Sequence, residues 1–478
     1  MNKTRLFIAS CISLLTTSMV FVIRGDVEGN MSSAFHLSKE QMGLIWGPAF
    51  WGFTISIFLC GYLNDVLGMK RLHILSSVGY IGGVLIVLFA PTPQVEKVDS
   101  IFGTTGTLML YGGFLIMGLS QGLVEGVINP LIATIYNEEK THKLNVLHAW
   151  WPGGLVIGAF AAILLTQMGA SWQVKLGSIL VPAVVYLAMI LGQEYPKTER
   201  VTSGVSNAAM TKEAFNPLFL LLFVCMWMTA ATELGPDQWF PSMMGKITGL
   251  QGVWFVIVTS AFMFVLRFFA GPIAHKISPI GLLVGCSILS TVGLYWLGSL
   301  KEGSSAFVAF LAAAVFGIGK TYFWPTMLGV TAERFPKGGS LLMCLMGGAG
   351  IYGVTKHGVV SLTESLYNEL ALAGSKVKVS VLCPGWVNTR IMDSARNRPE
   401  ELRNPVEQPA DPQRVAYEGI VRNLLQSGLS PSAVADRVLD AIREEQLYIL
   451  THPEMSEIIR VRFENILAQR NPTPRTLG

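Results

Sequence analysis

Long runs of apolar residues recur along the first three-quarters of the chain, between Leu6 and Ala332. A helix that crosses roughly 30 Å of hydrocarbon needs about 20 mostly apolar residues. Ten runs of this kind can be counted in the sequence, at 6–24, 42–63, 72–90, 107–133, 147–168, 172–192, 216–236, 252–274, 280–299 and 305–331. The pattern predicts an all-α polytopic membrane protein with about ten spans.

The pattern changes near Gly350. Residues 351–478 contain 15 Lys+Arg and 15 Asp+Glu in 128 positions, about 23% charged, against about 10% in the first 350. Periodicity predicts a helix over 354–373, an alternating strand over 376–382, a Pro-rich loop over 398–412 and a short strand over 447–450. The tail is therefore predicted to be an α/β fragment of a Rossmann-type fold.

The composition of the whole chain supports burial in lipid. Hydrophobic residues make up 51% of the chain and charged residues 14%, and the mean hydropathy is +0.49. The net charge of +4 is not gathered into an arm, so nucleic-acid binding has no support. The six cysteines show no paired spacing, which argues against a disulfide framework or a metal site. Nothing in the sequence predicts the oligomeric state.

Basic residues in the short loops give an orientation. They fall on one side of the predicted spans, at Lys3 and Arg5, Lys70 and Arg71, Lys140 and Lys143, His275 and Lys276, and Arg334 and Lys337. Lys and Arg are in excess in cytoplasmic loops. We therefore expect a multi-pass protein of the plasma (inner) membrane with both termini in the cytoplasm.

A glycine-rich basic loop follows the second predicted span. Gly61, Asp65 and Gly68 precede Lys70 and Arg71, in an order that resembles the signature loop of the major facilitator superfamily. Glycines permit a tight turn, Asp65 is suited to cap or neutralise neighbouring helix ends, and the basic pair holds the loop at the anionic membrane face. A weaker counterpart at 271–276 is expected between the eighth and ninth spans.

The fourth predicted span contains a carboxylate within an apolar run. An ionised carboxylate in the bilayer interior is costly, so such a residue normally faces a cavity or takes up a proton. Gln121, Glu125 and Asn129 follow one another at helical spacing and share one face. They are suited to hydrogen-bond a polyhydroxylated ligand. The alternative is a glutamate that pairs with a basic neighbour to hold two helices together.

The residues that follow Glu125 add a more specific resemblance. Asn129-Pro130, then Leu144-Asn145, His148, Trp150 and Gly153-Gly154, and later Phe323-Trp-Pro-Thr326, occur in an order that resembles the fucose:proton symporter branch of the superfamily. The resemblance implies that Glu125 is the proton-coupling acid. That branch also has an aspartate in its first span, for which the nearest candidate is Asp26. Trp150 is suited to stack on a sugar ring or to anchor at the membrane interface.

Other ionisable residues lie in the second group of spans. Glu233 precedes Gly235-Pro236, where a broken helix would place a gate or a ligand contact. Arg267 and Lys320 are cations within apolar runs, and either would neutralise Glu125 or Glu233 or extend to the surface. We expect Lys320 to face a cavity because glycines surround it.

The tail carries a different motif. Tyr352 and Lys356, followed by a helix and then by a strand ending in Pro384-Gly385 and Thr389, resemble the C-terminal half of a short-chain dehydrogenase/reductase. At i and i+4 on a helix the two side chains are neighbours, so the lysine favours a tyrosinate that acts as acid and base. The resemblance implies that Lys356 holds the nicotinamide ribose and that Pro384, Gly385 and Thr389 approach the nicotinamide.

These observations predict four regions. They are a six-helix transporter half (1–192), a cytoplasmic linker (193–215), a second transporter half (216–350) and the dehydrogenase-like fragment (351–478). A major facilitator has twelve spans, and the eleventh is expected to begin at Ser340 and to turn into the tail. Transport is expected to need no cofactor, and NAD(P) to bind only if a complete dehydrogenase half were supplied.

Three functions compete. The first is proton-coupled transport of a sugar or similar small polar solute by alternating access across the lipid bilayer. The second is NAD(P)-dependent oxidoreductase activity of the tail, which lacks a nucleotide-binding half. The third is a fusion artefact, or chimera, with neither activity.

Overall fold

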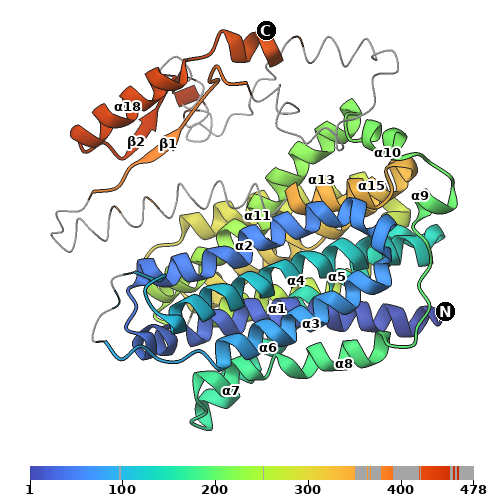
Figure 1. Cartoon of the computed structure of the whole chain (residues 1–478), viewed down its shortest axis with the longest axis horizontal. Coiled ribbons are helices and arrows are strands. Elements are labelled where there is room, and N and C mark those ends of the chain that lie inside the picture. The colour runs from blue at the N-terminus through green and yellow to red at the C-terminus, as the bar shows by residue number, and fades with distance from the viewer. Residues whose placement is uncertain are drawn as a thin grey trace. The chain divides into compact units, whose positions relative to one another are not determined.

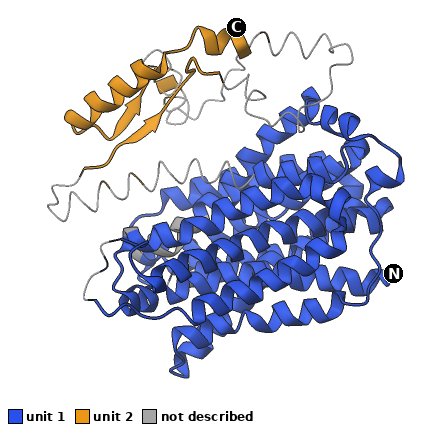
Figure 2. Cartoon of the chain, in the orientation of Figure 1, with its two compact units in different colours: residues 1–355 blue, residues 356–478 orange. Residues whose placement is uncertain are grey.

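The computed structural model describes residues 1–95, 98, 100–250, 252–349, 378–390 and 421–452, with positions 363, 367, 419, 456, 457, 460, 461 and 464. For residues 40, 237–243, 246 and 253 the backbone alone is described. The chain divides into two compact units, Met1–Thr355 and Lys356–Gly478 (Figure 2). The first is a bundle of long helices and the second contains a short parallel sheet (Figure 1).

The first part of the bundle is built from four long helices. They are α1 (Lys3–Phe35), α2 (Lys39–Leu63), α3 (Met69–Leu88) and α4 (Thr105–Ile135). Local sequence explains the helix starts: Asn2 caps α1, and Ser38 with Gln41 forms a capping box on α2. A π-helical turn, η1 (Asn64–Gly68), separates α2 from α3. The sharp turn at Gly68 has φ +82°, a conformation that favours glycine.

Shorter helices complete this part of the bundle and the linker. They are η2 (Asn137–Glu139), α5 (Lys140–His148), α6 (Trp150–Gln167), α7 (Trp172–Gly177), α8 (Leu180–Ile190), α9 (Glu199–Thr202) and α10 (Asn207–Glu213). Thr198 and Ser206 cap the two linker helices α9 and α10, so the predicted linker is partly helical.

The second part of the bundle contains α11 (Pro217–Thr248), α12 (Val253–Arg267), α13 (Ala270–Ser299), α14 (Ala306–Lys320), α15 (Phe323–Arg334) and the 3-10 turn η3 (Pro336–Gly338). Residues 339–349 are helical, where the eleventh span was predicted to begin.

Two sequence predictions in this part are wrong. The helix is not broken at Gly235-Pro236, because α11 continues through both residues. A membrane helix tolerates a proline when its neighbours satisfy the freed backbone group. The counterpart loop at 271–276 is also helical, and the irregular backbone lies later, at Ser278 (φ 66°) before Pro279. The residue before a proline disfavours helical backbone, which explains this position.

The ten predicted runs all correspond to helices. Among the described residues, eight helical segments are long and apolar enough to cross a membrane; one of them, Gln41–Leu88, contains both the second and the third run, and a shorter apolar helix, Trp254–Arg267, accounts for the remaining run. Exposed apolar side chains such as Met228, Ile288 and Tyr295 lie on the outer helices, as expected for contact with lipid.

Glycines set the close packing of α4 against α2. A Cβ atom at Gly118 would lie 2.5 Å from the carbonyl oxygen of Ala49, and one at Gly126 would lie 2.5 Å from the Cβ of Cys60. Small residues at such contacts let two membrane helices approach closely. This packing fixes the position of Glu125, which neighbours Gly126 on α4.

The second unit contains β1 (Val381–Cys383), α18 (Pro431–Arg443) and β2 (Tyr448–Leu450). The two strands pair in parallel, with Leu382 opposite Ile449. Parallel pairing requires a crossover connection, as in a Rossmann-type fold. The predicted helix at 354–373 and loop at 398–412 lie outside the described residues, apart from positions 363 and 367.

Candidate functional site

Glu125 lies in the interior of the bundle on α4. The residue is only 5% exposed, and its Oε2 atom has no hydrogen-bond partner within the described part of the chain. Asn129 and Trp324 are its polar neighbours, and Glu233 and Arg267 lie within electrostatic range. Glu125 is therefore surrounded by residues from both parts of the bundle, although it lies on a helix of the first.

Asn129 connects α4 to α5. It follows Glu125 by one helical turn, and its Oδ1 atom lies 2.8 Å from Nε2 of His148. Both residues are buried, at 1% and 2% exposed. The amide oxygen accepts this bond, so the ring nitrogen that faces Asn129 carries the proton. The predicted residues Glu125, Asn129 and His148 are thus brought together, and Gln121 lies one turn earlier on α4, partly buried.

Arg267 joins the two parts of the bundle. Its Nη1 donates to the carbonyl oxygen of His148 at 2.6 Å, and its Nε donates to the carbonyl oxygen of Thr321 at 2.6 Å. Its Nη2 lies 2.9 Å from Oε1 of Glu233 in a buried ion pair. The arginine is 1% exposed. One guanidinium therefore holds α5, α11 and α14 against α12.

The contacts of Arg267 show which of the two predicted acids it pairs with. The sequence left Arg267 and Lys320 as alternatives for Glu125 or Glu233, and the structure pairs Arg267 with Glu233. Lys320 is fully buried, with its Nζ 5.0 Å from the ring centroid of Phe316. We call Glu125, Asn129, His148, Arg267 and Glu233 the central polar chain.

Trp150 lies beside the central polar chain at the start of α6. Its ring packs edge-on against Phe264 of α12, with 5.5 Å between centroids. Gly153 contacts the same ring, because a Cβ atom there would lie 2.7 Å from Cδ2 of Phe264. Trp150 therefore has an aromatic partner within the protein, in a second contact between the two parts of the bundle.

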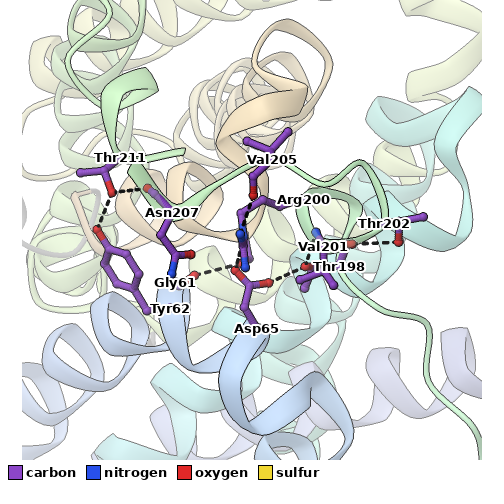
Figure 3. A network of polar contacts seen from close by, with 11 residues as sticks. Gly61, Tyr62, Asp65, Thr198, Arg200, Val201, Thr202, Val205, Asn207 and Thr211 are labelled. Atoms are coloured by element: carbon purple, nitrogen blue, oxygen red, sulfur yellow. Dashed lines mark hydrogen bonds and ion pairs between the residues drawn. The ribbon is translucent and has the colours of Figure 1, made fainter. Parts of the chain in front are cut away.

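The glycine-rich loop contacts the linker (Figure 3). Oδ2 of Asp65 lies 2.6 Å from Nε of Arg200, and the hydroxyl of Thr198 donates to Oδ1 of the same carboxylate. Thr198 also caps α9, so Asp65 contacts the beginning of a linker helix. The sequence analysis named Asp65 but not these partners, which lie more than 130 residues further along the chain. In the sequence, the only features that could have indicated these partners were a threonine suited to cap a helix, Thr198, and a basic residue, Arg200.

The rest of the loop follows the same pattern. Gly61 accepts a hydrogen bond at its carbonyl oxygen from Ser340, and a Cβ atom there would lie 2.9 Å from Cδ1 of Leu341. Gly68 is the residue before α3, Lys70 is partly buried and Arg71 is exposed. The loop thus packs against helix 339–349 as well as against the linker.

The described part of the tail contains Pro384, Gly385 and Thr389 of the residues that the resemblance assigns to a dinucleotide site. Tyr352 and Lys356 lie outside the described residues. The amide of Gly385 donates to Oγ1 of Thr451 at 3.1 Å and to Nδ1 of His452 at 3.2 Å. The resemblance implies that Gly385 approaches a nicotinamide, but the backbone amide of Gly385 is already hydrogen-bonded within the tail.

Comparison with known proteins identifies the bundle. Residues 6–353 match the family model of the Major Facilitator Superfamily. The chain belongs to the Major Facilitator Superfamily. A second model, for the short chain dehydrogenase family, matches residues 344–400 of this superfamily member. Both family predictions made from the sequence are confirmed, and the chain is a multi-span membrane protein with a dehydrogenase-like segment.

Individual relatives are distant. A protein TsgA homolog of Buchnera aphidicola is 24% identical over 281 residues, which cover 56% of this chain and 68% of that protein. The structure of the E. coli fucose:proton symporter FucP is 14% identical, covers 77% of this chain and 92% of that chain, and gives a TM-score of 0.59. This likeness shows a shared fold.

The tail has its own relative. The CLA biosynthesis dehydrogenase/reductase of Lactiplantibacillus plantarum is 29% identical over 126 residues, 25% of this chain and 43% of that protein. The similar region is less than half of the dehydrogenase.

Proposed function

We propose that the bundle carries a small polar solute, of sugar type, across the plasma membrane by alternating access, and that Glu125 couples this movement to a proton. The central polar chain supports the proposal. It runs from a carboxylate on α4 through Asn129 and His148 to an ion pair on α11 and α12, and so crosses between the two parts of the bundle.

The environment of Glu125 suits a proton carrier. Arg267, a cation within electrostatic range, is already paired with Glu233, and Oε2 of Glu125 has no hydrogen-bond partner among the described residues. A buried carboxylate without a dedicated cation is costly when ionised and becomes acceptable when protonated. Either a bound proton or a hydrogen bond from a solute hydroxyl would stabilise the Glu125 carboxylate. Replacement of one by the other would link proton movement to solute movement.

The proposal includes the predicted organisation. Regions 1–192 and 216–350 are the two moving halves, 193–215 is the cytoplasmic linker, and both termini lie in the cytoplasm. Alternating access requires that contacts between the halves open and close. The bond from Arg267 to His148 and the loop that contains Asp65 would be among them.

Proteoliposomes test the coupling. L-Fucose and D-xylose serve as radiolabelled probes, because the structures that share the fold include a fucose and a xylose proton symporter. We expect uptake driven by an inward proton gradient. Glu125→Gln should abolish accumulation against a gradient but retain exchange of labelled for unlabelled sugar, because the amide mimics the protonated acid.

Glu302→Gln is the matched control, since Glu302 is exposed in the turn between α13 and α14. It should accumulate sugar as the unchanged protein does. Accumulation by Glu125→Gln at the unchanged rate would contradict the role of Glu125, and no uptake of either sugar would contradict transport of these solutes.

The tail supports a second candidate only in part. The match to the short chain dehydrogenase model and the parallel strands β1 and β2 favour an oxidoreductase origin. Because the similar region covers only 43% of the dehydrogenase/reductase relative, we propose that this tail neither binds NAD(P) tightly nor turns it over unless another chain supplies the nucleotide-binding half. Saturable quenching of NADH fluorescence by the full chain would contradict this, and absence of both activities would favour a chimera.

A further inference from the structure

Arg24 is a buried cation without an acceptor among the residues that the structure describes. It lies on α1 and is 7% exposed, and within the described part of the chain it forms neither a hydrogen bond nor an ion pair. Glu28, one turn later, lies within electrostatic range but forms no ion pair with it. A guanidinium carries five N–H donors, and burying them unpaired is costly. The arrangement therefore leaves the donors of Arg24 for an acceptor from outside the described chain.

Three aromatic rings hold this cation in place. Its Cζ atom lies 5.4 Å from the ring centroid of Phe21, 5.2 Å from that of Trp46 and 4.8 Å from that of Phe50. Aromatic faces within about 6 Å attract a guanidinium. They do not replace an oxygen that accepts from its N–H groups. The rings thus position Arg24 and leave its hydrogen-bonding capacity available.

Trp46 supplies a second unsatisfied donor. Its indole Nε1 is buried and has no hydrogen-bond partner among the described residues. A buried indole N–H usually finds a partner. Arg24 on α1 and Trp46 on α2 therefore both lack an acceptor at the same place. A negatively charged oxygen group satisfies both, whereas a neutral hydroxyl compensates the charge poorly.

The place where Arg24 lies connects to Glu125 along α1. On α1, Arg24 lies two turns, about 10 Å, beyond Thr17. The hydroxyl of Thr17 lies 2.8 Å from that of Tyr80.

Tyr80 in turn lies within electrostatic range of Glu125. One face of α1 thus leads from the unsatisfied donors of Arg24 and Trp46 toward the central polar chain.

We propose that Arg24 and Trp46, with Phe21 and Phe50 as supports, form the binding site for an anionic group of the carried solute. The solute is then a small hydroxycarboxylate of the sugar-acid class. Its carboxylate binds Arg24 and its hydroxyl groups lie toward Glu125 and Asn129. This inference rests on the proposed transport function and specifies its substrate class.

Equilibrium binding to the full chain in phosphatidylcholine nanodiscs tests the site. D-Glucuronate and D-glucose are the probes, because they share a ring and differ in one carboxylate. We expect glucuronate to bind about tenfold more tightly or better, as for a charge-assisted bidentate contact. Arg24→Gln should reduce the ratio of the two affinities to near one. Arg24→Lys should retain part of the preference, because a lysine keeps the positive charge but lacks the planar guanidinium that binds a carboxylate through two hydrogen bonds.

Lys301→Gln, an exposed cation in the turn between α13 and α14, should keep the full preference. Three results overturn the inference: equal affinities or no glucuronate binding in the unchanged protein, an undiminished preference in Arg24→Gln, or loss of glucuronate binding when phosphatidylglycerol is added. The last would assign Arg24 to a lipid phosphate. Uptake of a neutral sugar by the same protein would leave the transport function standing, so the two failures are distinguishable.

Discussion

Arg267 and Arg24 are both buried in the membrane bundle, and they differ in what surrounds the guanidinium. Arg267 donates to two backbone carbonyl oxygens and pairs with Glu233, so the protein supplies its acceptors. Arg24 is surrounded by three aromatic rings and has no acceptor among the described residues. The first joins helices, and the second is prepared for a ligand.

The comparison separates two meanings of a buried charge. When the protein itself supplies the hydrogen-bond and ion-pair partners of a buried charge, those partners show which helices the charge connects. Such helices either stay together or separate during the transport cycle. A charge that the protein leaves unsatisfied costs free energy in the empty state, and that cost is recovered when a ligand binds. Stability measurements should therefore respond to the two arginines in opposite directions.

The largest effect is expected for Arg267→Met. The substitution leaves Glu233 buried without its arginine and removes the donors to His148 and Thr321. Removing one partner of a buried ion pair typically costs about 3–5 kcal/mol. The melting temperature of the full chain in detergent should fall accordingly.

The double variant Arg267→Met with Glu233→Gln provides the control. Because the amide carries no charge, the double variant should recover part of the lost stability. A loss below about 1 kcal/mol for Arg267→Met, the range of exposed pairs, would show that Arg267 does not hold the helices together.

The sequence predicted the bundle and its most unusual residue, but not how the charges pair. A glutamate inside an apolar run is conspicuous, so Glu125 was identified without a structure. The choice between Glu125 and Glu233 as partner of Arg267 depends on the packing of α4, α11 and α12, which no local pattern encodes. Asp65 was identified by its place in the glycine-rich basic loop, whereas its partner Arg200 lies on a distant linker.

Arg24 was missed because its surroundings come from two helices. In the sequence it marks the end of an apolar run, as if it reached the membrane surface. The structure continues α1 to Phe35 and places Arg24 beside Trp46 and Phe50. The resemblance had instead directed attention to Asp26, whose carboxylate pairs with Lys175 at 2.7 Å.

An intermediate effect is expected at the glycine-rich loop. Arg200 is 12% exposed and its partner Asp65 4%, so this pair is less buried than that of Arg267 and Glu233. Asp65→Asn should cost about 2 kcal/mol, as for a hydrogen bond to a charged group. It should also release the linker, which increased tryptic cleavage between Lys197 and Lys212 would detect.

Asp26→Asn is the matched control for the linker. It breaks a carboxylate–lysine pair of similar length near the opposite end of the bundle, because α1 and α2 run antiparallel. Linker cleavage should not change in this variant. Equal cleavage of the Asp65→Asn and unchanged proteins would show that Asp65 does not fix the linker.

The smallest effect, and the one of opposite sign, is expected for Arg24→Met. The substitution gives up cation–π attraction of about 2 kcal/mol or more at a desolvated site. It also removes a desolvation penalty of several kcal/mol, because no acceptor pairs with the charge. The empty protein should therefore keep its stability or gain about 1 kcal/mol, measured as an unchanged or higher melting temperature in detergent.

Adding D-glucuronate completes this test. A ligand that binds only the folded state raises its melting temperature, so glucuronate should stabilise the unchanged protein and not Arg24→Met. If Arg24→Met instead loses as much stability as Arg267→Met, the protein itself satisfies Arg24 and the two arginines are alike. Loss of the glucuronate response without loss of stability is the combination that a purely structural arginine would not produce.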